Sequence, residues 1–291
     1  MKICLQHIAQ LPCWTSRVDP LPLEGGLTNH NFRVRDAGQD YVVRVGADLP
    51  EHGVSRCNEV NAARAAYRAG LGPEIIHVEP SIMVMRFIEG QVLTPEQVRQ
   101  PTTLQRLLEI VRSCHHEVAE YLRPGVLNFW VFQVNRSYIS QLQQAQSSYC
   151  SDLPILRQRN TILEQAVGPV HLVFSHNDML AANFIDDGDR MWLLDWEYAG
   201  FNSPLFDLAN LAANNVLPEE QQRWLLKHYF DNVVDDRLWY RYQAMKCASL
   251  LRESLWSMVS ELHSKLDYDY TTYTRQNMAC FKQAWLTFRA C

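Results

Sequence analysis

The sequence lacks the features that mark several common classes of protein. Its 291 residues contain no G-x-x-x-x-G-K-[ST] phosphate loop, which excludes the P-loop class of nucleotide-binding proteins. No apolar run is long enough to cross a bilayer, and Gln6, His7 and Gln10 interrupt the start of the chain. We therefore expect neither membrane insertion nor a signal peptide. Internal repeats and low-complexity segments are also absent from the sequence.

The chain also lacks an excess of basic residues. Lys and Arg total 27 against 32 Asp and Glu, and the net charge is −5. A nucleic-acid partner is therefore not expected, because binding to a phosphate backbone normally needs a basic face. The eight cysteines are scattered and form no C-x-x-C pair, which favours free thiols in a reducing cytoplasm. The hydrophobic fraction of 47% is enough for one large domain or two lobes.

The first third of the chain is predicted to be rich in β-structure. A polar turn at 36–40 separates two extended segments, which indicates a hairpin. Apolar residues at helical spacing then predict one helix, which begins near Ser55 and stops at Gly70-Leu71-Gly72-Pro73. The expected strands are 23–35, 41–45, 75–78 and 82–88.

The remainder of the chain is predicted to be mostly helical, with one β-rich island. The sequence thus indicates an α+β protein of two lobes: an N-terminal nucleotide-binding lobe at 1–88 and a C-terminal catalytic and substrate-binding lobe at 89–291. The expected helices lie near 95–122, 135–165, 205–229, 236–263 and 268–288, and the island comprises 170–174, 183–185 and 190–195.

The strongest chemical signal is the segment from His176 to Asn183, which has the form H-x-D-x-x-x-x-N and is followed by an apolar strand that ends in Asp195. Phosphoryl transfer needs a carboxylate to orient and deprotonate the attacking hydroxyl, and oxygen ligands for Mg²⁺. Asp178 suits the first task, and Asn183 and Asp195 suit the second. Each alone could be a turn or capping residue, but their joint spacing favours catalysis. We interpret His176 as a scaffold for the loop.

A second, weaker signal lies at the start of the chain. Gly25-Gly26-Leu27-Thr28-Asn29 predicts a turn whose backbone N–H groups could approach phosphates. Arg44 on the next strand could contact the same phosphates, held by the carboxylate of Glu59 on the following helix.

Together these segments resemble the bacterial choline/ethanolamine kinase family, within the wider group of aminoglycoside phosphotransferases and protein-kinase-like enzymes. The likeness spans nearly the whole chain. Its most specific parts are the H-N-D…N block and the Asp-Trp-Glu-Tyr-Ala-Gly block. The residues that carry the resemblance are 25–29, 41–45, 83–90, 175–178 with Asn183, 192–200 and 206–210.

The resemblance implies a two-lobed protein-kinase-like fold that binds ATP and Mg²⁺ in the cleft between the lobes. Asp178 would be the catalytic base, Asn183 and Asp195 would hold Mg²⁺, and Asp207 would support the catalytic loop. The phosphates would lie near Gly26, Thr28 and Asn29, with Arg44 and Glu59 beside them, and the adenine would lie against Met85, Phe87 and Ile88.

The same resemblance implies a small amino-alcohol substrate, choline or ethanolamine, held by aromatic faces and carboxylates. Trp256 and Tyr273 fall where the family places cage aromatics, and Glu197 and Tyr198 complete the expected set. The sequence departs from the family at two positions. Glu253 stands where a further aromatic is expected, and Asn214 where a carboxylate is expected. A carboxylate at 253 would suit a primary ammonium, which favours ethanolamine or another amino alcohol over choline.

Two alternatives remain open on the sequence alone. The first is a kinase of the same fold that acts on another small hydroxylated compound, such as thiamine, an aminoglycoside or a methylated sugar. The second is an ATP-binding pseudokinase that regulates a partner. A pseudokinase would be expected to lack Asp178, Asn183 or Asp195, and all three are present. The oligomeric state cannot be read from the sequence.

Overall fold

A computed structural model describes residues 5–23, 29–123, 125–264, 266 and 268–291. Its smaller lobe is built on a five-stranded antiparallel sheet with the order β1-β2-β3-β5-β4. Gly26 and Thr28, which the sequence places near the phosphates, lie outside the described residues. The strands are β1 (Leu21–Leu23), β2 (His30–Asp36), β3 (Gln39–Val45), β4 (Ile75–Glu79) and β5 (Ile82–Arg86).

The predicted hairpin is formed by β2 and β3. Ala37 and Gly38 connect the strands, both with positive φ angles of 47° and 82°. Two successive residues with positive φ match the right-handed twist of the paired strands. Phe32 and Val34 alternate with more exposed residues and pack with β3, β5 and the short helix α1 (Leu5–Ala9) in a separate small core.

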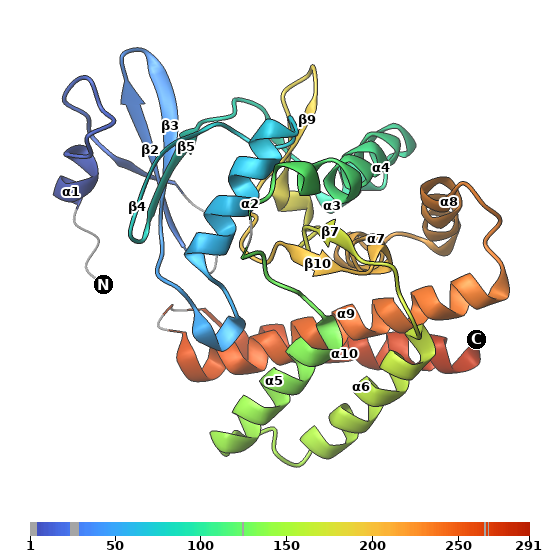
Figure 1. Cartoon of the computed structure of the whole chain (residues 1–291). Helices are drawn as coiled ribbons and strands as arrows, with labels where there is room; N and C mark the ends of the chain where they lie inside the picture. Colours follow the sequence, from blue (N-terminus) through green and yellow to red (C-terminus); the bar gives the residue numbers. More distant parts are fainter. Residues whose placement is uncertain (1–4, 24–28, 124, 265, 267) are drawn as a thin grey trace.

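One main helix, α2 (Arg56–Arg68), lies between the sheet and the helical lobe (Figure 1). Its alanines, including Ala62 and Ala66, pack into the large core of the protein. Gly70, with a φ of 77°, follows the helix, as the sequence predicts. On the same face, one turn before Ala62, α2 carries Glu59, which is buried.

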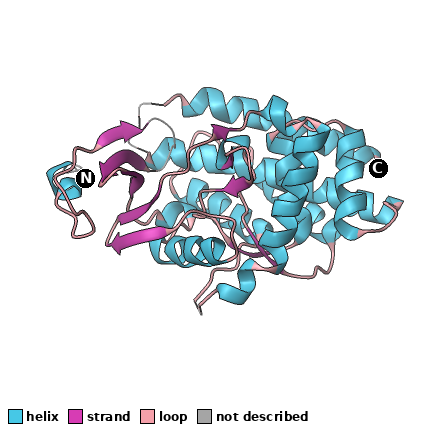
Figure 2. Cartoon of the chain, turned by 90° about the horizontal axis from the view of Figure 1, so that it is seen from above, coloured by secondary structure: helices cyan, strands magenta, loops and turns pink. Residues whose placement is uncertain are grey.

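The larger lobe is mostly helical (Figures 1 and 2). Its central helix is α9, which contacts α5, α6, α7 and α10. Most residues of α9 are buried by these contacts. Within the described part of the chain, no helix combines the length and apolar character that crossing a bilayer requires. The helices are α3 (Pro95–Val98), α4 (Pro101–His116), α5 (Val131–Gln144), α6 (Leu153–Val167), α7 (Pro204–Asn214), α8 (Glu219–Phe230), α9 (Asp236–His263) and α10 (Tyr270–Ala290).

Three of the expected long helices are each divided in the structure. The segment 95–122 breaks before Pro101, and 205–229 breaks before Pro218, because the residue that precedes a proline is disfavoured in helical conformation. The segment 135–165 is interrupted at 145–152, where Gln146 has a φ of 50°. The sequence prediction of continuous helices was therefore wrong at these points, whereas α9 matches its expected range.

Short strands flank the loops that connect some of the helices of the larger lobe. β7 (Val173–Ser175) pairs with β10 (Gly200–Asn202), and β8 (Phe184–Asp186) pairs with β9 (Met191–Leu193) and with β6 (Gln91–Val92). The predicted β-rich island is confirmed, although β6 and β10 were not foreseen. The structure also confirms the two-lobed fold of a sheet lobe and a helical lobe.

Candidate active site

The loop between β7 and β8 is held by one buried carboxylate. Asp207, at the start of α7 and with 0% exposure, accepts hydrogen bonds from the backbone N–H groups of His176 (2.9 Å) and Asn177 (2.8 Å). The ring of His115 also contacts it, at 3.0 Å. Asn177 has a φ of 67°, a strained conformation that these bonds stabilise. The position of Asp207 agrees with the supporting role that the resemblance implies.

His176 connects this loop to the segment that carries Asp195. Its Nε2 donates to the carbonyl oxygen of Leu194 at 2.8 Å, and its Nδ1 accepts the backbone N–H of Asp178 at 3.3 Å. Because Nδ1 accepts, the proton of a neutral ring is on Nε2. Burial lowers the pKa of His176, which keeps it neutral. Both ring nitrogens are thus used in scaffolding, as the sequence predicts.

Asp178 and Asn183 lie side by side at the two ends of this loop. Asn183 Nδ2 donates to the backbone carbonyl of Asp178 (2.8 Å) and to its Oδ2 (3.1 Å). Burial raises the pKa of Asp178 to about 8; Arg252 opposes this rise, and Glu253 and Asp195 add to it. A carboxyl group with a pKa near neutrality is suited to general-base chemistry.

Asp195 follows β9 in a left-handed conformation with a φ of 68°. Its Oδ1 lies 2.6 Å from Arg44 Nη1, and the same nitrogen lies 2.5 Å from Glu59 Oε1. Burial by itself would raise the pKa of Asp195, but the charge and hydrogen bond of Arg44 outweigh it, so the pKa is lowered. The carboxylate is therefore ionised at neutral pH, unlike that of Asp178.

A second arginine extends this network, and the sequence reasoning missed it. Arg56 Nη1 lies 2.6 Å from Glu59 and 3.2 Å from Glu197. Its spacing of three residues from Glu59 on one helix face could have revealed the pair. Asn29 donates to Glu197 at 3.1 Å and does not line the cavity described below, although the sequence placed it near the phosphates.

A cavity of about 530 Å³ opens between the two lobes and includes these groups. At one end its surface is apolar, formed by residues such as Val42, Ala63, Leu180 and Ile185. At the other end lie side chains of α9 and α10. Apart from Asn29, every expected site residue within the described part of the chain lines this cavity: Arg44, Glu59, Met85, Phe87, Ile88, Asp178, Asn183, Asp195, Glu197, Tyr198, Glu253, Trp256 and Tyr273.

Another hollow, of about 630 Å³, lies against α2, β4 and β5. It shares Arg44 and Glu59 with the interlobe cavity but does not include Asp178, Asn183 or Asp195. Size alone does not identify an active site. The interlobe cavity is the candidate because Asp178 and Asn183, on the loop between β7 and β8, line it together with Asp195.

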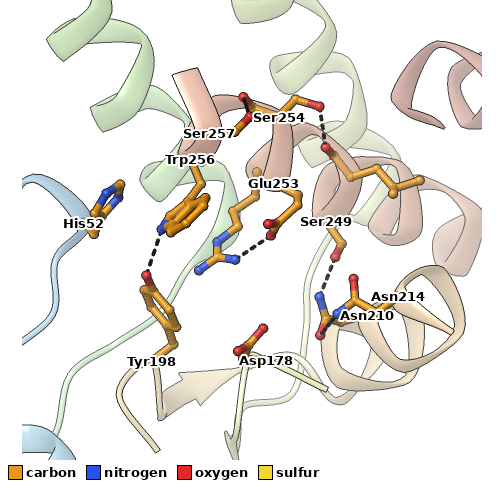
Figure 3. Close-up of polar contacts among 12 residues, drawn as sticks. His52, Asp178, Tyr198, Asn210, Asn214, Ser249, Glu253, Ser254, Trp256 and Ser257 are labelled. Atoms are coloured by element: carbon orange, nitrogen blue, oxygen red, sulfur yellow. Dashed lines mark hydrogen bonds and ion pairs between the residues drawn. The ribbon is translucent and has the colours of Figure 1, made fainter. Parts of the chain in front are cut away.

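The α9 end of the cavity has an aromatic surface (Figure 3). Trp256 Nε1 donates to the hydroxyl of Tyr198 at 2.9 Å, and the ring of Trp256 meets that of Tyr273 edge-on at 6.4 Å between centroids. In Figure 3, Trp256 and Glu253 extend from α9 toward the space that Tyr198 and Asp178 approach from the opposite side. The cage aromatics expected from the sequence are thus brought together beside Asp178.

Glu253 is already bonded to a cation that the sequence reasoning did not consider. One of its oxygens lies 2.9 Å from Arg252 Nη1, and the other accepts the hydroxyl of Tyr273 at 2.8 Å. Arg252 is only 2% exposed and lines the same cavity. Arg252 lies four residues after Ala248 and three before Leu255, so it falls on the apolar face of the predicted helix. A charged residue at such a position could have been noticed in the sequence.

Asn214, the other departure from the family pattern, lies away from the cavity surface. Its Nδ2 donates to Oδ1 of Asn210 at 3.1 Å, and Asn210 bonds Ser249 at 3.0 Å (Figure 3). The same Asn210 oxygen accepts the backbone N–H of Met179 at 2.6 Å. Asn214 thus belongs to an amide network that supports the loop between β7 and β8, and it does not line the cavity.

Comparisons with known proteins agree with this geometry. Protein LicA of Haemophilus influenzae is 27% identical over 215 residues, a match that spans 72% of this chain and 62% of that protein. A choline/ethanolamine kinase family protein from Mesorhizobium loti has a structure that is similar with a TM-score of 0.76 and 28% identity, over 96% of this chain and 92% of that one.

A more distant structural relative shows how widely the fold is shared. Spectinomycin phosphotransferase, solved in complex with ADP and spectinomycin, has a TM-score of 0.63 at 14% identity and covers 98% of both chains. The family model described as choline/ethanolamine kinase matches residues 21–218, which is more than half of the chain. This protein belongs to the choline/ethanolamine kinase family.

Proposed function

We propose that this protein transfers the γ-phosphoryl group of Mg·ATP to the hydroxyl group of a small amino alcohol, of which choline and ethanolamine are the simplest examples. The observation that carries the proposal is the joint presence, in one cavity, of Asp178, the Arg44–Asp195 pair and the aromatic surface around Trp256. Asp178 would be the general base, the Arg44–Asp195 pair would lie beside the phosphates, and the aromatic surface would hold the cationic group of the acceptor.

The apolar end of the cavity suits a nucleotide base. Met85, Phe87 and Ile88 lie at the connection between the lobes, opposite Leu180 and Ile185 of the helical lobe. An adenine ring would be enclosed between these surfaces. Its triphosphate would then extend toward Arg44, whose guanidinium remains charged because two carboxylates flank it.

The donor atoms near the triphosphate fit Mg²⁺. Asn183 uses Nδ2 for its bonds to Asp178, which leaves its amide oxygen for a metal, and Asp195 is ionised. Two protein oxygens are a usual contribution for Mg²⁺, which takes its other ligands from phosphates and water. When bound, the metal neutralises charge on the β- and γ-phosphates.

Asp178 would orient the acceptor hydroxyl and take its proton. The bond between the γ-phosphorus and the ADP oxygen breaks, a bond from phosphorus to the acceptor oxygen forms, and the proton passes to Asp178. Asn183, bonded to Asp178 Oδ2, fixes the rotamer of the carboxylate. The remaining oxygen, Oδ1, is directed to the acceptor.

The aromatic end of the cavity would hold the ammonium group of the acceptor. Rings of Tyr198, Trp256 and Tyr273 supply faces that stabilise a desolvated cation, and the carboxylates of Glu253 and Glu197 supply negative charge nearby. The alternative of another small hydroxylated substrate, thiamine or an aminoglycoside, uses the same catalytic groups and differs only at this end.

Parallel turnover assays test the proposal. ATP consumption by the purified protein with Mg²⁺ would be measured against choline, ethanolamine, thiamine and kanamycin, with Asp178→Ala as the inactive control. Saturable turnover with an amino alcohol supports the proposal. Turnover with only thiamine or kanamycin would replace the substrate assignment, and ATP binding without turnover of any hydroxylated compound would favour the pseudokinase.

A further inference from the structure

Arg252 is a buried cation at the end of the cavity where an ammonium group is expected. The residue is 2% exposed, lines the cavity and is close enough to Asp178 to oppose the rise in the pKa of that carboxyl group. A buried guanidinium is costly unless its charge and its N–H groups are satisfied. The groups that Arg252 contacts, and the N–H groups that it leaves unpaired, therefore indicate which chemical groups a ligand in the cavity would carry.

The hydrogen-bonding capacity of Arg252 is only partly used. Nη1 donates to Glu253 at 2.9 Å. Nε and Nη2 are buried and have no hydrogen-bond partner among the described residues. The Tyr138 hydroxyl lies beside the guanidinium, whose charge and hydrogen bonding counter part of the burial-driven rise in the pKa of Tyr138. Nε and Nη2 form one edge of the guanidinium, the side on which two parallel N–H groups match the two oxygens of a carboxylate.

The guanidinium also occupies an aromatic face that a substrate cation would use. Its central carbon lies 4.4 Å from the ring centroid of Tyr198 and 5.7 Å from that of Phe129. An acceptor that carries only an ammonium group would bring a second cation beside Arg252, with Glu253 as the carboxylate that both contact. Like charges in an enclosed site repel strongly, because little water screens them.

An acceptor with its own negative charge removes this conflict. We propose, on the basis of the phosphotransferase function proposed above, that the preferred acceptor is a small hydroxy amino acid. Its hydroxyl would face Asp178, its ammonium group would lie near Glu253 and Trp256, and its carboxylate would bind the Nε–Nη2 edge of Arg252. Because both nitrogens are buried in the structure, this contact requires the guanidinium to turn toward the cavity that Arg252 lines.

Matched pairs of acceptors isolate the contribution of the carboxylate. L-Serine is ethanolamine with an added carboxylate, and L-homoserine is related to 3-aminopropanol in the same way. With Mg·ATP, we expect kcat/KM of the wild-type protein to be at least about tenfold higher for the carboxylate-bearing member of a pair, since a charge-assisted bidentate contact contributes this much or more.

Variants at position 252 assign that preference to Arg252. Arg252→Met should lower the preference for the carboxylate-bearing acceptor by at least about tenfold, chiefly through KM, while KM for ATP stays the same. Arg252→Lys keeps the positive charge but lacks the two parallel N–H donors of a guanidinium, so it should retain part of the preference. Arg237→Met, an exposed residue on the same helix, is the matched control and should behave as wild type.

The possible outcomes separate this inference from the function on which it rests. Equal or better turnover of ethanolamine and 3-aminopropanol by the wild-type protein would overturn the inference and leave the proposed function in place. Binding of Mg·ATP with no turnover of any of the four acceptors or of choline would overturn both. If Arg252→Met does not fold, the wild-type ratios and the Arg252→Lys variant still decide.

Discussion

The guanidinium of Arg44 on β3 lies 2.6 Å from the carboxylate of Asp195, which follows β9. This ion pair crosses from the sheet lobe to the helical lobe, and Glu59 holds the same guanidinium at 2.5 Å. The contact fixes the positions of the two groups relative to one another, and both are proposed above to face the phosphates. The two lobes are thus joined by residues that line the cavity and that are proposed to bind the nucleotide.

Arg44→Met should weaken both the fold and nucleotide binding. Removing one partner of a buried ion pair costs about 3–5 kcal/mol, because the remaining carboxylates stay buried without a counter-charge. Urea denaturation and ATP titration measure the two effects. Arg35→Met, on the exposed side of the neighbouring strand β2, is the matched control. Unchanged ATP affinity in Arg44→Met would contradict the placement of the phosphates.

Asp178→Asn should remove the proton acceptor with little effect on ATP binding. The rate of transfer should fall by about 10²–10⁴-fold, the usual contribution of a general base. Asp189→Asn, in the exposed turn between β8 and β9, tests whether loss of any nearby carboxylate has the same effect. Near-normal turnover by Asp178→Asn would show that another group accepts the proton.

The pH dependence of the reaction should report Asp178. Burial raises the pKa of this carboxyl group to about 8, so in the free protein it is protonated at lower pH and cannot accept a proton. We expect kcat/KM to fall as the pH decreases below about 8 and to level off above it. Choline or carnitine should serve as the acceptor, because their charges stay constant over this range. A kcat/KM that does not change with pH, or a decrease at low pH that is also seen in Asp178→Asn, would refute the assignment of this pKa to Asp178.

Asp207→Ala should act on stability and on the position of the loop. The substitution leaves the backbone N–H groups of His176 and Asn177 buried without an acceptor, at a cost of about 1–3 kcal/mol for each group. Chemical denaturation measures the loss, with Asp189→Ala as the exposed control. A stability equal to that of the wild-type protein would show that the loop does not depend on this carboxylate.

The clustering of the candidate catalytic residues could be predicted from the sequence because most of them lie in one short stretch. Asp178 and Asn183 lie between β7 and β8, and Asp195 directly follows β9, so short connections bring the three side chains to one cavity. The hairpin at Ala37 and Gly38 was predictable for the same reason, since turn residues act locally.

The substrate end of the cavity was harder to predict, because the packing of α9 against α7 and α10 decides which faces of these helices line the cavity. Glu253 was expected to be available to an ammonium group, but the neighbouring Arg252 is also buried and pairs with it. Asn214 was expected near the substrate, but α7 directs it to Asn210. The helix breaks before Pro101 and Pro218 show that a proline interrupts a helix even where the apolar periodicity continues through it.

Identification of the product tests the central claim most directly. The purified protein would be incubated with Mg·ATP and each of ethanolamine, choline, L-serine and L-homoserine, and the products followed by ³¹P NMR, with Asp178→Asn in parallel. We predict a new phosphate monoester signal that grows as ADP forms, that requires an acceptor and Mg²⁺, and that is nearly absent with the variant. ADP formation without a monoester, or equal monoester formation by Asp178→Asn, would contradict the account.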